Sequence, residues 1–323
     1  MSRAEPLPKS LRDAAFTVDE AKRHGIQRSR LRANDLETPT RGVRVAKPSR
    51  PSTIPVDESP TARMQRLKKD LVRRAEEYAP ALTPDQFYSG ATGLALLGCP
   101  IPYSRDDELA LHVAARHPAG KPRRTGTVGH RLQTRKPARQ TIRELPVEHP
   151  ARLWRQATAE WSLDDLVVAG DFLVLPQRNL LTLGDLEREI DEAGDPGGVL
   201  ARALAEIRVG AESPEETRLR LALIRAGLPE PELNWSLHAR DQRFIARLDL
   251  AFPRYRVASE YDGRGHAFDD AQFKRDADRW DDIRATGWIL VRILSHHLRP
   301  DPQVAVRKVA DQLIAAGWRP GAD

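Results

Sequence analysis

The residues best suited to chemistry lie in the acidic segment EYDGRGHAFDD (260–270) and in the apolar run before it. Asp249 stands in that run, and Glu260 and Asp262 follow in the next strand-like segment. Because side chains alternate along a strand, Glu260 and Asp262 share one face. A hairpin between the two segments brings Asp249 beside Glu260. The spacing therefore predicts two or three carboxylates close together.

Carboxylates held so close repel one another, by roughly 1–4 kcal/mol per pair at effective dielectric constants between 80 and 20. A divalent cation removes this repulsion, and Mg²⁺ prefers oxygen ligands supplied by carboxylates, water and substrate phosphate. Such an ion activates a water molecule and polarises the phosphorus that the water attacks. The cluster thus indicates phosphodiester hydrolysis with Mg²⁺ or Mn²⁺. The alternatives are a solvated strand edge and a simple Asp-Gly turn.

Further residues extend the candidate site. Glu216 lies in the first turn of a helix predicted over 213–227 from its Ser-Pro start and terminal glycine. His266 is either a general base or phosphate contact, or an ordinary polar loop residue. Asp276 and Arg279 could form a helix-borne polar pair near the site, although we favour a surface ion pair.

Composition limits the class of protein. Of 323 residues, 40% are hydrophobic and 30% charged, and no run approaches the ~18 apolar residues of a membrane helix. The first residues contain no apolar segment of a secretory signal. A single cysteine, Cys99, excludes an internal disulfide framework and a thiolate zinc cluster. We expect a soluble cytoplasmic protein with no membrane partner.

The charge is divided unevenly along the chain. Residues 1–140 carry 27 Lys and Arg against 15 Asp and Glu, whereas residues 141–323 carry 25 against 31. This division predicts that the basic half meets a polyanion such as DNA, while the acidic half has its own acidic centre. Ordinary scatter in an arginine-rich chain is the alternative.

The segment 16–48 is predicted to form a winged helix-turn-helix. Thr17 and Glu20 have capping-box spacing for a first helix, a second helix is expected over 27–33, and TRGVRVA forms the wing. The basic residues expected to contact DNA are Arg28, Arg30, Arg32, Arg41 and Arg44.

The middle of the chain alternates between helical and strand patterns. A helix is predicted over 83–102, and three short strands over 108–115, 124–132 and 141–147. Four helices are expected between 149 and 207. The histidines of this region lack metal-ligand spacing and a neighbouring nucleophile, so we interpret them as surface or hydrogen-bonded residues; they are His112, His117, His130 and His149.

The C-terminal region has the order α-β-β-β-α-β-α. The helix with Glu216 precedes three strands of an antiparallel meander, and a helix over 269–287 follows. WILVRILS is almost entirely apolar, which predicts a strand at the buried centre of the sheet. The resulting fold class is a multidomain α/β protein with a winged helix-turn-helix (10–48), a linker (49–60), an α+β middle domain (61–205) and a C-terminal domain (210–320).

The C-terminal third resembles a known family. SPEETRLRLALIRAGLPEPE, RLDLAFP, EYDGRGH, FKRDADR and GWILVRI, in this order, resemble the endonuclease-like domain of unknown function related to very-short-patch-repair endonucleases, within the PD-(D/E)xK superfamily. The resemblance implies a restriction-endonuclease-like αβββαβ core and Mg²⁺-dependent DNA cleavage. By position it makes Glu216 the acid of the leading helix, and Asp249 and Glu260 the acids of the strands.

One position departs from the superfamily pattern. The lysine of E-x-K falls at 262, where this chain has Asp262. The related subfamily often has this E-x-D-G form, but the positive group that orients the water is missing. His266, Lys274 or a second ion would have to replace it.

Residues 16–48 are similar to the winged-helix N-terminal domain of AbiEi-type antitoxins, and FYSGATGLALLGCPIP, ELALHV and HPARLW are loosely similar to the domain that follows it there. This resemblance implies DNA binding and brings no catalytic residues. Two hypotheses follow: a DNA endonuclease targeted by its basic N-terminal domain, or an antitoxin-like regulator with an inactive nuclease-like domain and a possible toxin or regulatory protein partner. A scaffolding role is the third alternative.

Overall fold

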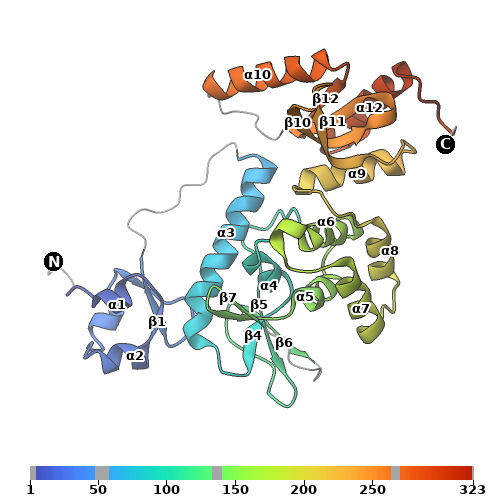
Figure 1. The fold of residues 1–323 in the computed structure, drawn as a ribbon. Helices are drawn as coiled ribbons and strands as arrows, with labels where there is room; N and C mark the ends of the chain where they lie inside the picture. The colour runs from blue at the N-terminus through green and yellow to red at the C-terminus, as the bar shows by residue number, and fades with distance from the viewer. Residues whose placement is uncertain (1–4, 48–57, 133–139, 263–269, 322–323) are drawn as a thin grey trace. The chain divides into compact units, whose positions relative to one another are not determined.

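The computed structural model describes residues 5–47, 58–132, 140–262 and 270–321, with the backbone alone for 270–277. The chain folds into two compact units, Met1–Trp161 and Ser162–Asp323, which both contain helices and strands (Figure 1). The protein is therefore a multidomain α/β protein. No helix in the described ranges is long and apolar enough to span a bilayer.

The N-terminal elements of the first unit surround a small antiparallel sheet of order β1-β3-β2. Phe16 and Leu31 are buried in its core, and the Thr17 side chain caps α2 by accepting a hydrogen bond from Glu20 N at 3.0 Å, as predicted. The elements are α1 (Lys9–Arg12), β1 (Phe16–Thr17), α2 (Val18–Arg23), β2 (Leu36–Glu37) and β3 (Val43–Ala46).

The second helix predicted over 27–33 is wrong. A single 3₁₀ turn, η1 (Arg30–Arg32), occupies this stretch, and Ala33 already has extended dihedral angles. The buried Leu31 fixes the turn. Both terminal nitrogens of Arg30 donate hydrogen bonds to the carboxylate of Asp35, at 2.9 and 2.8 Å. These contacts end the turn where the sequence pattern suggested further helix.

The second sheet of this unit has five strands in the order β6-β5-β4-β8-β7. The predicted helix over 83–102 is wrong in its first part, because the buried Phe87 and Tyr88 belong to β4 and Gly90, at φ +50°, turns the chain into α4. The elements are α3 (Pro60–Tyr78), η2 (Ala79–Ala81), β4 (Gln86–Tyr88), α4 (Gly90–Leu96), β5 (Leu111–Arg116), β6 (Thr127–Leu132), β7 (Gln140–Ile142), β8 (Leu145–Val147) and α5 (Pro150–Ala157).

The third strand predicted for this region is a hairpin. Strands β7 and β8 pair antiparallel on either side of Arg143 and Glu144, which both have positive φ, 51° and 64°. Positive φ at both central residues is the geometry of a two-residue type I′ turn, whose twist matches that of the strands. Arg-Glu is not a typical sequence for this turn, so the pattern alone gave one strand.

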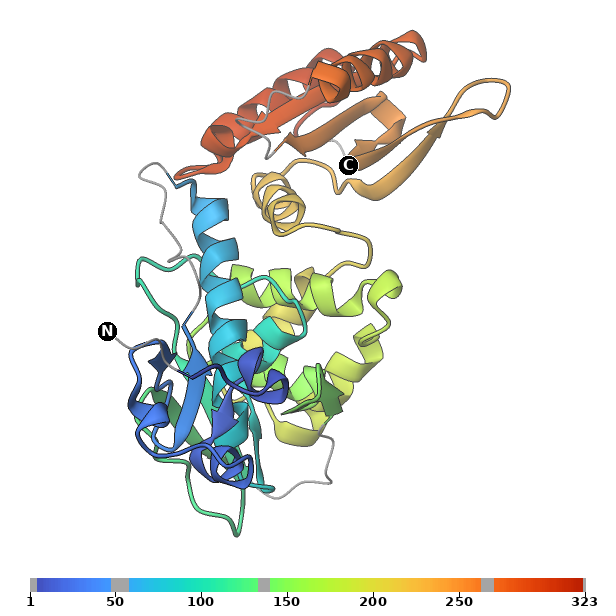
Figure 2. The same ribbon diagram turned by 90° about the vertical axis from the view of Figure 1, so that its left-hand side faces the viewer.

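The second unit contains a four-stranded sheet of order β12-β11-β10-β9. Strands β11 and β12 are parallel, and the other pairs are antiparallel; the β9–β10 hairpin projects from the sheet (Figure 2). The elements are α6 (Leu163–Val174), η3 (Pro176–Arg178), α7 (Leu183–Ala193), α8 (Val199–Glu206), α9 (Pro214–Arg225), β9 (Glu232–His238), β10 (Phe244–Phe252), η4 (Pro253–Tyr255), β11 (Val257–Asp262), α10 (Asp270–Ala285), β12 (Ile289–Leu294), α11 (Ser295–Leu298) and α12 (Gln303–Ala315).

Hydrophobic clusters cover both faces of this sheet. Val257 packs in a cluster with residues of α9 and α12, whereas the next residue, Ala258, packs in a second cluster with Ile283 of α10. Successive strand residues face opposite sides, so α10 covers the face opposite α9 and α12. The predicted order α-β-β-β-α-β-α agrees with these elements, apart from the short α11 before the last helix.

The prediction that WILVRILS forms the centre of the sheet is wrong. In the described sheet β12 is an edge strand, and β10 and β11 are central. Its apolar character has another cause, because Val291 and Ile293 pack in one hydrophobic cluster and Leu290 packs against the other. A strand covered by helices on both faces is apolar whether or not it has two strand neighbours.

The chain divides between Trp161 and Ser162, so α6, α7 and α8 are in the C-terminal unit, although the sequence grouped them with the middle region. A buried ion pair joins α6 to α9: Asp171 accepts hydrogen bonds from Arg220 and from Thr217 Oγ1, each at 2.8 Å. Asp171 and Arg220 are each 1% exposed. Burial raises the pKa of Asp171 although Arg220 lowers it, so desolvation of this pair is costly.

Breaking this pair should destabilise the second unit strongly. Arg220→Met leaves a buried carboxylate uncompensated and is expected to lower the free energy of unfolding by about 3–5 kcal/mol in urea denaturation. Arg225→Met on the same helix removes exposed pairs with Asp164 and Glu206 and should cost less than about 1 kcal/mol. Equal losses in the two variants would contradict the role given to the buried pair.

Candidate functional site

The strand register places Asp249 opposite Glu260. Strands β10 and β11 pair antiparallel with Leu250 opposite Ser259, and continuing this register by one residue gives Asp249 and Glu260. Asp249 Oδ2 accepts a hydrogen bond from Tyr261 N at 3.3 Å, so its carboxylate lies against β11. The predicted proximity of these two acids agrees with this arrangement.

Glu216 lies at the start of α9, where its own backbone and the helix cap hold it. Ser213 is the N-cap, and its Oγ accepts a hydrogen bond from Glu216 N at 3.2 Å, as the sequence predicts. Glu216 Oε2 accepts from Glu212 N at 3.0 Å. The side chain is buried, and this burial raises its pKa.

Glu216 and Glu260 both act electrostatically on Asp249. The pKa of Asp249 rises from 3.8 to about 7, first because the group is buried and then because Glu216 and Glu260 are close enough to disfavour a further negative charge. Arg279 and the hydrogen bond from Tyr261 N oppose this increase. Burial together with like charges is the arrangement that marks many functional carboxylates.

Arg279 lies beside these acids, which the sequence allowed only as the less favoured alternative. It was expected to form a surface pair with Asp276, whose side chain lies outside the described residues. Instead its guanidinium group binds Glu260, with Nη1 to Oε2 at 3.0 Å and Nη2 to Oε1 at 2.5 Å, and Nη2 also donates to Arg247 O at 3.0 Å. Glu260 is thus neutralised by a residue of α10.

A second guanidinium group holds Asp262. Arg292 of β12 forms an ion pair with this carboxylate and stacks over the Trp280 ring, with 4.0 Å from Cζ to the ring centroid. A positive group therefore contacts position 262, where the superfamily pattern has lysine. His266 and the side chain of Lys274 lie outside the described residues.

The metal prediction has no direct support in the geometry. Among the described residues, no three His, Cys, Asp or Glu side chains lie close enough together to form a metal-binding group. The donor chemistry nevertheless suits a hard divalent cation, because three carboxylates share one electrostatic environment. To bind the ion, Glu260 would have to give up its hydrogen bonds with Arg279.

The five arginines predicted to contact DNA divide into two groups. Arg30 bonds to Asp35, and Arg44 donates to Leu31 O and Val43 O, each at 2.8 Å, so these two hold the N-terminal fold together. The other three have exposed side chains; they are Arg28, Arg32 and Arg41.

The chain is 34% identical over 127 residues to an uncharacterized protein of Mycobacterium tuberculosis strain H37Rv and, to the same degree, to one of strain CDC 1551. The match covers 39% of this chain and 46% of each relative, so the aligned part spans less than half the length of the relatives. No protein-family model and no solved structure matches the chain. The proposed function therefore rests on the arrangement of Glu216, Asp249 and Glu260.

Asp249 should give the protein an unusual dependence of stability on pH. Its pKa is about 7 in the folded chain against an ordinary value of 3.8, so between these values the folded state binds the extra proton. The contribution of Asp249 to the free energy of unfolding therefore falls as the pH rises from about 4 to about 7, and it stays low above pH 7.

Asp249→Asn removes this dependence. In urea denaturation with EDTA, we expect the variant to be more stable than the parent at about pH 8, by up to about 4 kcal/mol, and equally stable near pH 4. Asp281→Asn, on the exposed side of α10, is the control and should change little at either pH. A gap that does not depend on pH would contradict the raised pKa.

Proposed function

We propose that the C-terminal unit hydrolyses phosphodiester bonds in DNA with Mg²⁺ or Mn²⁺, on a restriction-endonuclease-like αβββαβ core. The observation that carries the proposal is the register that sets Asp249 opposite Glu260 on the two central strands, with Glu216 of α9 close enough to act on Asp249. Holding acids close together is costly, and a cation bound between these oxygens and a DNA phosphate would offset their repulsion.

The roles of the residues follow from their contacts. Asp249 and Glu260 supply the oxygens that would hold the cation, and Glu216 adds negative charge from its fixed position at the helix start. When bound, the cation supplies an activated water and polarises the phosphate. Arg279 neutralises Glu260 and would be freed toward a DNA phosphate when the cation binds. Arg292 keeps a positive charge beside Asp262.

The N-terminal unit would bind the DNA through a small winged fold in which the second helix of the helix-turn-helix is reduced to the 3₁₀ turn η1. Arg28 lies just before the turn that replaces the expected second helix, Arg32 is the last residue of this turn, and Arg41 precedes the β3 strand of the wing. Arg124 donates to Arg41 O at 2.9 Å, so a further guanidinium group lies beside this strand. Phosphate contacts of this kind position a protein on DNA without reading sequence.

An antitoxin-like regulator with an inactive nuclease domain is the second candidate, and a specific observation favours it. Arg279 already satisfies Glu260 with two hydrogen bonds, as it would in a nuclease fold that has lost its metal. In that case the basic N-terminal unit would bind DNA, and the carboxylates would hold the domain together or contact a partner protein.

Cleavage separates the two candidates. We expect the full chain to cut supercoiled plasmid with Mg²⁺ or Mn²⁺ but not with EDTA. Asp249→Asn and Glu260→Gln should each lower the rate by at least about 100-fold, since each removes a charged oxygen ligand. Asp281→Asn, an exposed acid of the same unit, should cut normally. DNA binding without cleavage under either metal would favour the regulator.

DNA binding should depend on the exposed arginines. Replacing Arg28, Arg32 and Arg41 together by alanine should weaken binding to duplex DNA and flatten the slope of log K against log salt by roughly 2.7, at 0.9 for each lost phosphate contact. Fluorescence anisotropy at several salt concentrations measures both quantities.

The control triple variant replaces Arg188, Arg202 and Arg307, which are exposed in the other unit and carry the same total charge. Equal losses in both triples would mean that net charge alone drives binding, and would contradict the N-terminal contact.

A further inference from the structure

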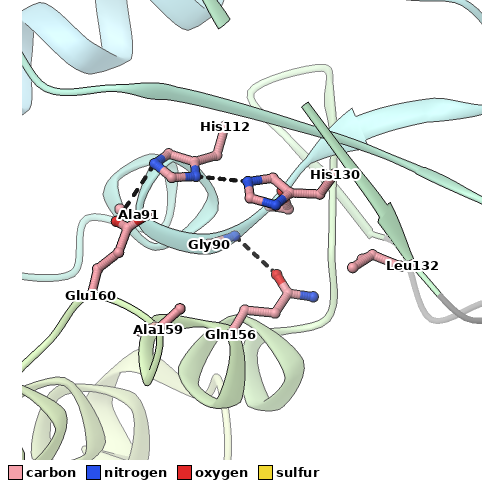
Figure 3. Close-up of a pocket in the computed structure, with 10 residues that line it drawn as sticks. Gly90, Ala91, His112, His130, Leu132, Gln156, Ala159 and Glu160 are labelled. Atoms are coloured by element: carbon pink, nitrogen blue, oxygen red, sulfur yellow. Dashed lines mark hydrogen bonds and ion pairs between the residues drawn. The ribbon is translucent and has the colours of Figure 1, made fainter. Parts of the chain in front are cut away.

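A pocket of about 120 Å³ lies in the first unit (Figure 3). That volume exceeds the space of one water molecule several times over and admits a small organic molecule. Polar groups from two strands and two helix ends line it, together with alanines and Leu132. The polar residues are Ser89, His112, His130, Gln156 and Glu160.

Two hydrogen-bonding groups in the pocket wall have no partner among the residues that the structure describes. Ser89 is 2% exposed and its Oγ is unbonded, and Gln156 Nε2 is likewise buried and unbonded. The other side of the Gln156 amide is fixed, because its Oε1 accepts from Gly90 N at 2.9 Å. A buried donor without an acceptor lowers the stability of the folded protein. Two such donors at the same pocket suggest that a ligand supplies the acceptor.

A hydrogen-bonded histidine pair forms the opposite wall. His112 Nδ1 and His130 Nε2 are 2.9 Å apart, and the two rings are nearly parallel, at 6°. Glu160 Oε2 lies 3.7 Å from His112 Nε2, which favours a proton on that nitrogen. His112 Nδ1 then accepts the proton of His130 Nε2, and His130 Nδ1 is left as an acceptor on the side facing Gln156 (Figure 3).

The pair carries no charge near neutral pH. Burial lowers the pKa of His112, against the opposing effect of Glu160. Burial also lowers the pKa of His130, and nearby His112 and Lys121 lower it further. None of the described residues that line the pocket is a Lys or Arg, and an anion would meet the Glu160 carboxylate. An uncharged ligand avoids both costs.

We propose that this pocket binds a small uncharged ligand with adjacent N–H and C=O groups, such as a cyclic amide or imide of the size of a pyrimidine base. The ligand N–H donates to His130 Nδ1, and its carbonyl oxygen accepts from Gln156 Nε2 and Ser89 Oγ. This site is independent of the proposed nuclease, because none of its residues belongs to the C-terminal unit.

Uracil is the probe, with acetate as the anionic comparison, in titration calorimetry of the full chain at millimolar concentrations and about pH 7.5. We expect uracil to bind at one site and acetate not to bind. Ser89→Ala removes an unbonded hydroxyl and should fold normally, yet weaken uracil about five- to tenfold. Gln156→Glu keeps an oxygen for Gly90 N and removes the amide donor, so it should weaken uracil as well.

Gln303→Glu, an exposed change of the same kind, should leave the affinity unaltered. Acidification below the ordinary imidazole range should weaken uracil, because protonation removes the His130 acceptor, whereas an anion site would tighten. Absence of uracil binding, acetate binding that strengthens at low pH, or uracil affinity unchanged in Ser89→Ala and Gln156→Glu would each overturn the proposal.

Discussion

The cost of partly burying Asp249 near two other acids is the constraint on which the site in the C-terminal unit depends. Asp249 is half-buried near Glu216 and Glu260, and its pKa of about 7 reflects first the loss of hydration and then the repulsion from these two acids. The central strands and the start of α9 hold the acids in place from three sides. Acids with strongly shifted pKa values are often found at functional sites, and this is why we propose a function for the cluster.

Two arginine side chains balance the negative charge of the acids on β11. Arg279 from α10 neutralises Glu260, and Arg292 from β12 neutralises Asp262, so each acid on β11 has a cation from a neighbouring element. A nuclease would exchange Arg279 for a metal ion, whereas an inactive relative would keep it permanently. The same contact is therefore central to both functional candidates, and cation binding distinguishes them.

Local patterns predicted much of the C-terminal unit. The Ser213 cap, the strand alternation and the apolar stripes are short-range signals, and the register that joins Asp249 to Glu260 follows from a short hairpin link. Contacts distant in sequence were not predictable in the same way. Arg279 and Glu260 are 19 residues apart in the sequence. Asp171 and Arg220 are 49 residues apart, and their ion pair joins α6 to α9. His112 and His130 meet only because β5 and β6 run parallel.

The most direct test is a calorimetric titration of Mn²⁺ into the full chain without DNA, at about pH 8, compared with Asp249→Asn. The account predicts one binding site in the parent protein and its loss in the variant, since Asp249 and Glu260 supply the oxygens. Arg279→Met should bind Mn²⁺ more tightly than the parent, because Glu260 then has no competing cation. No Mn²⁺ binding in either the parent or Arg279→Met, or binding that survives Asp249→Asn, would contradict the claim that these carboxylates form a metal site.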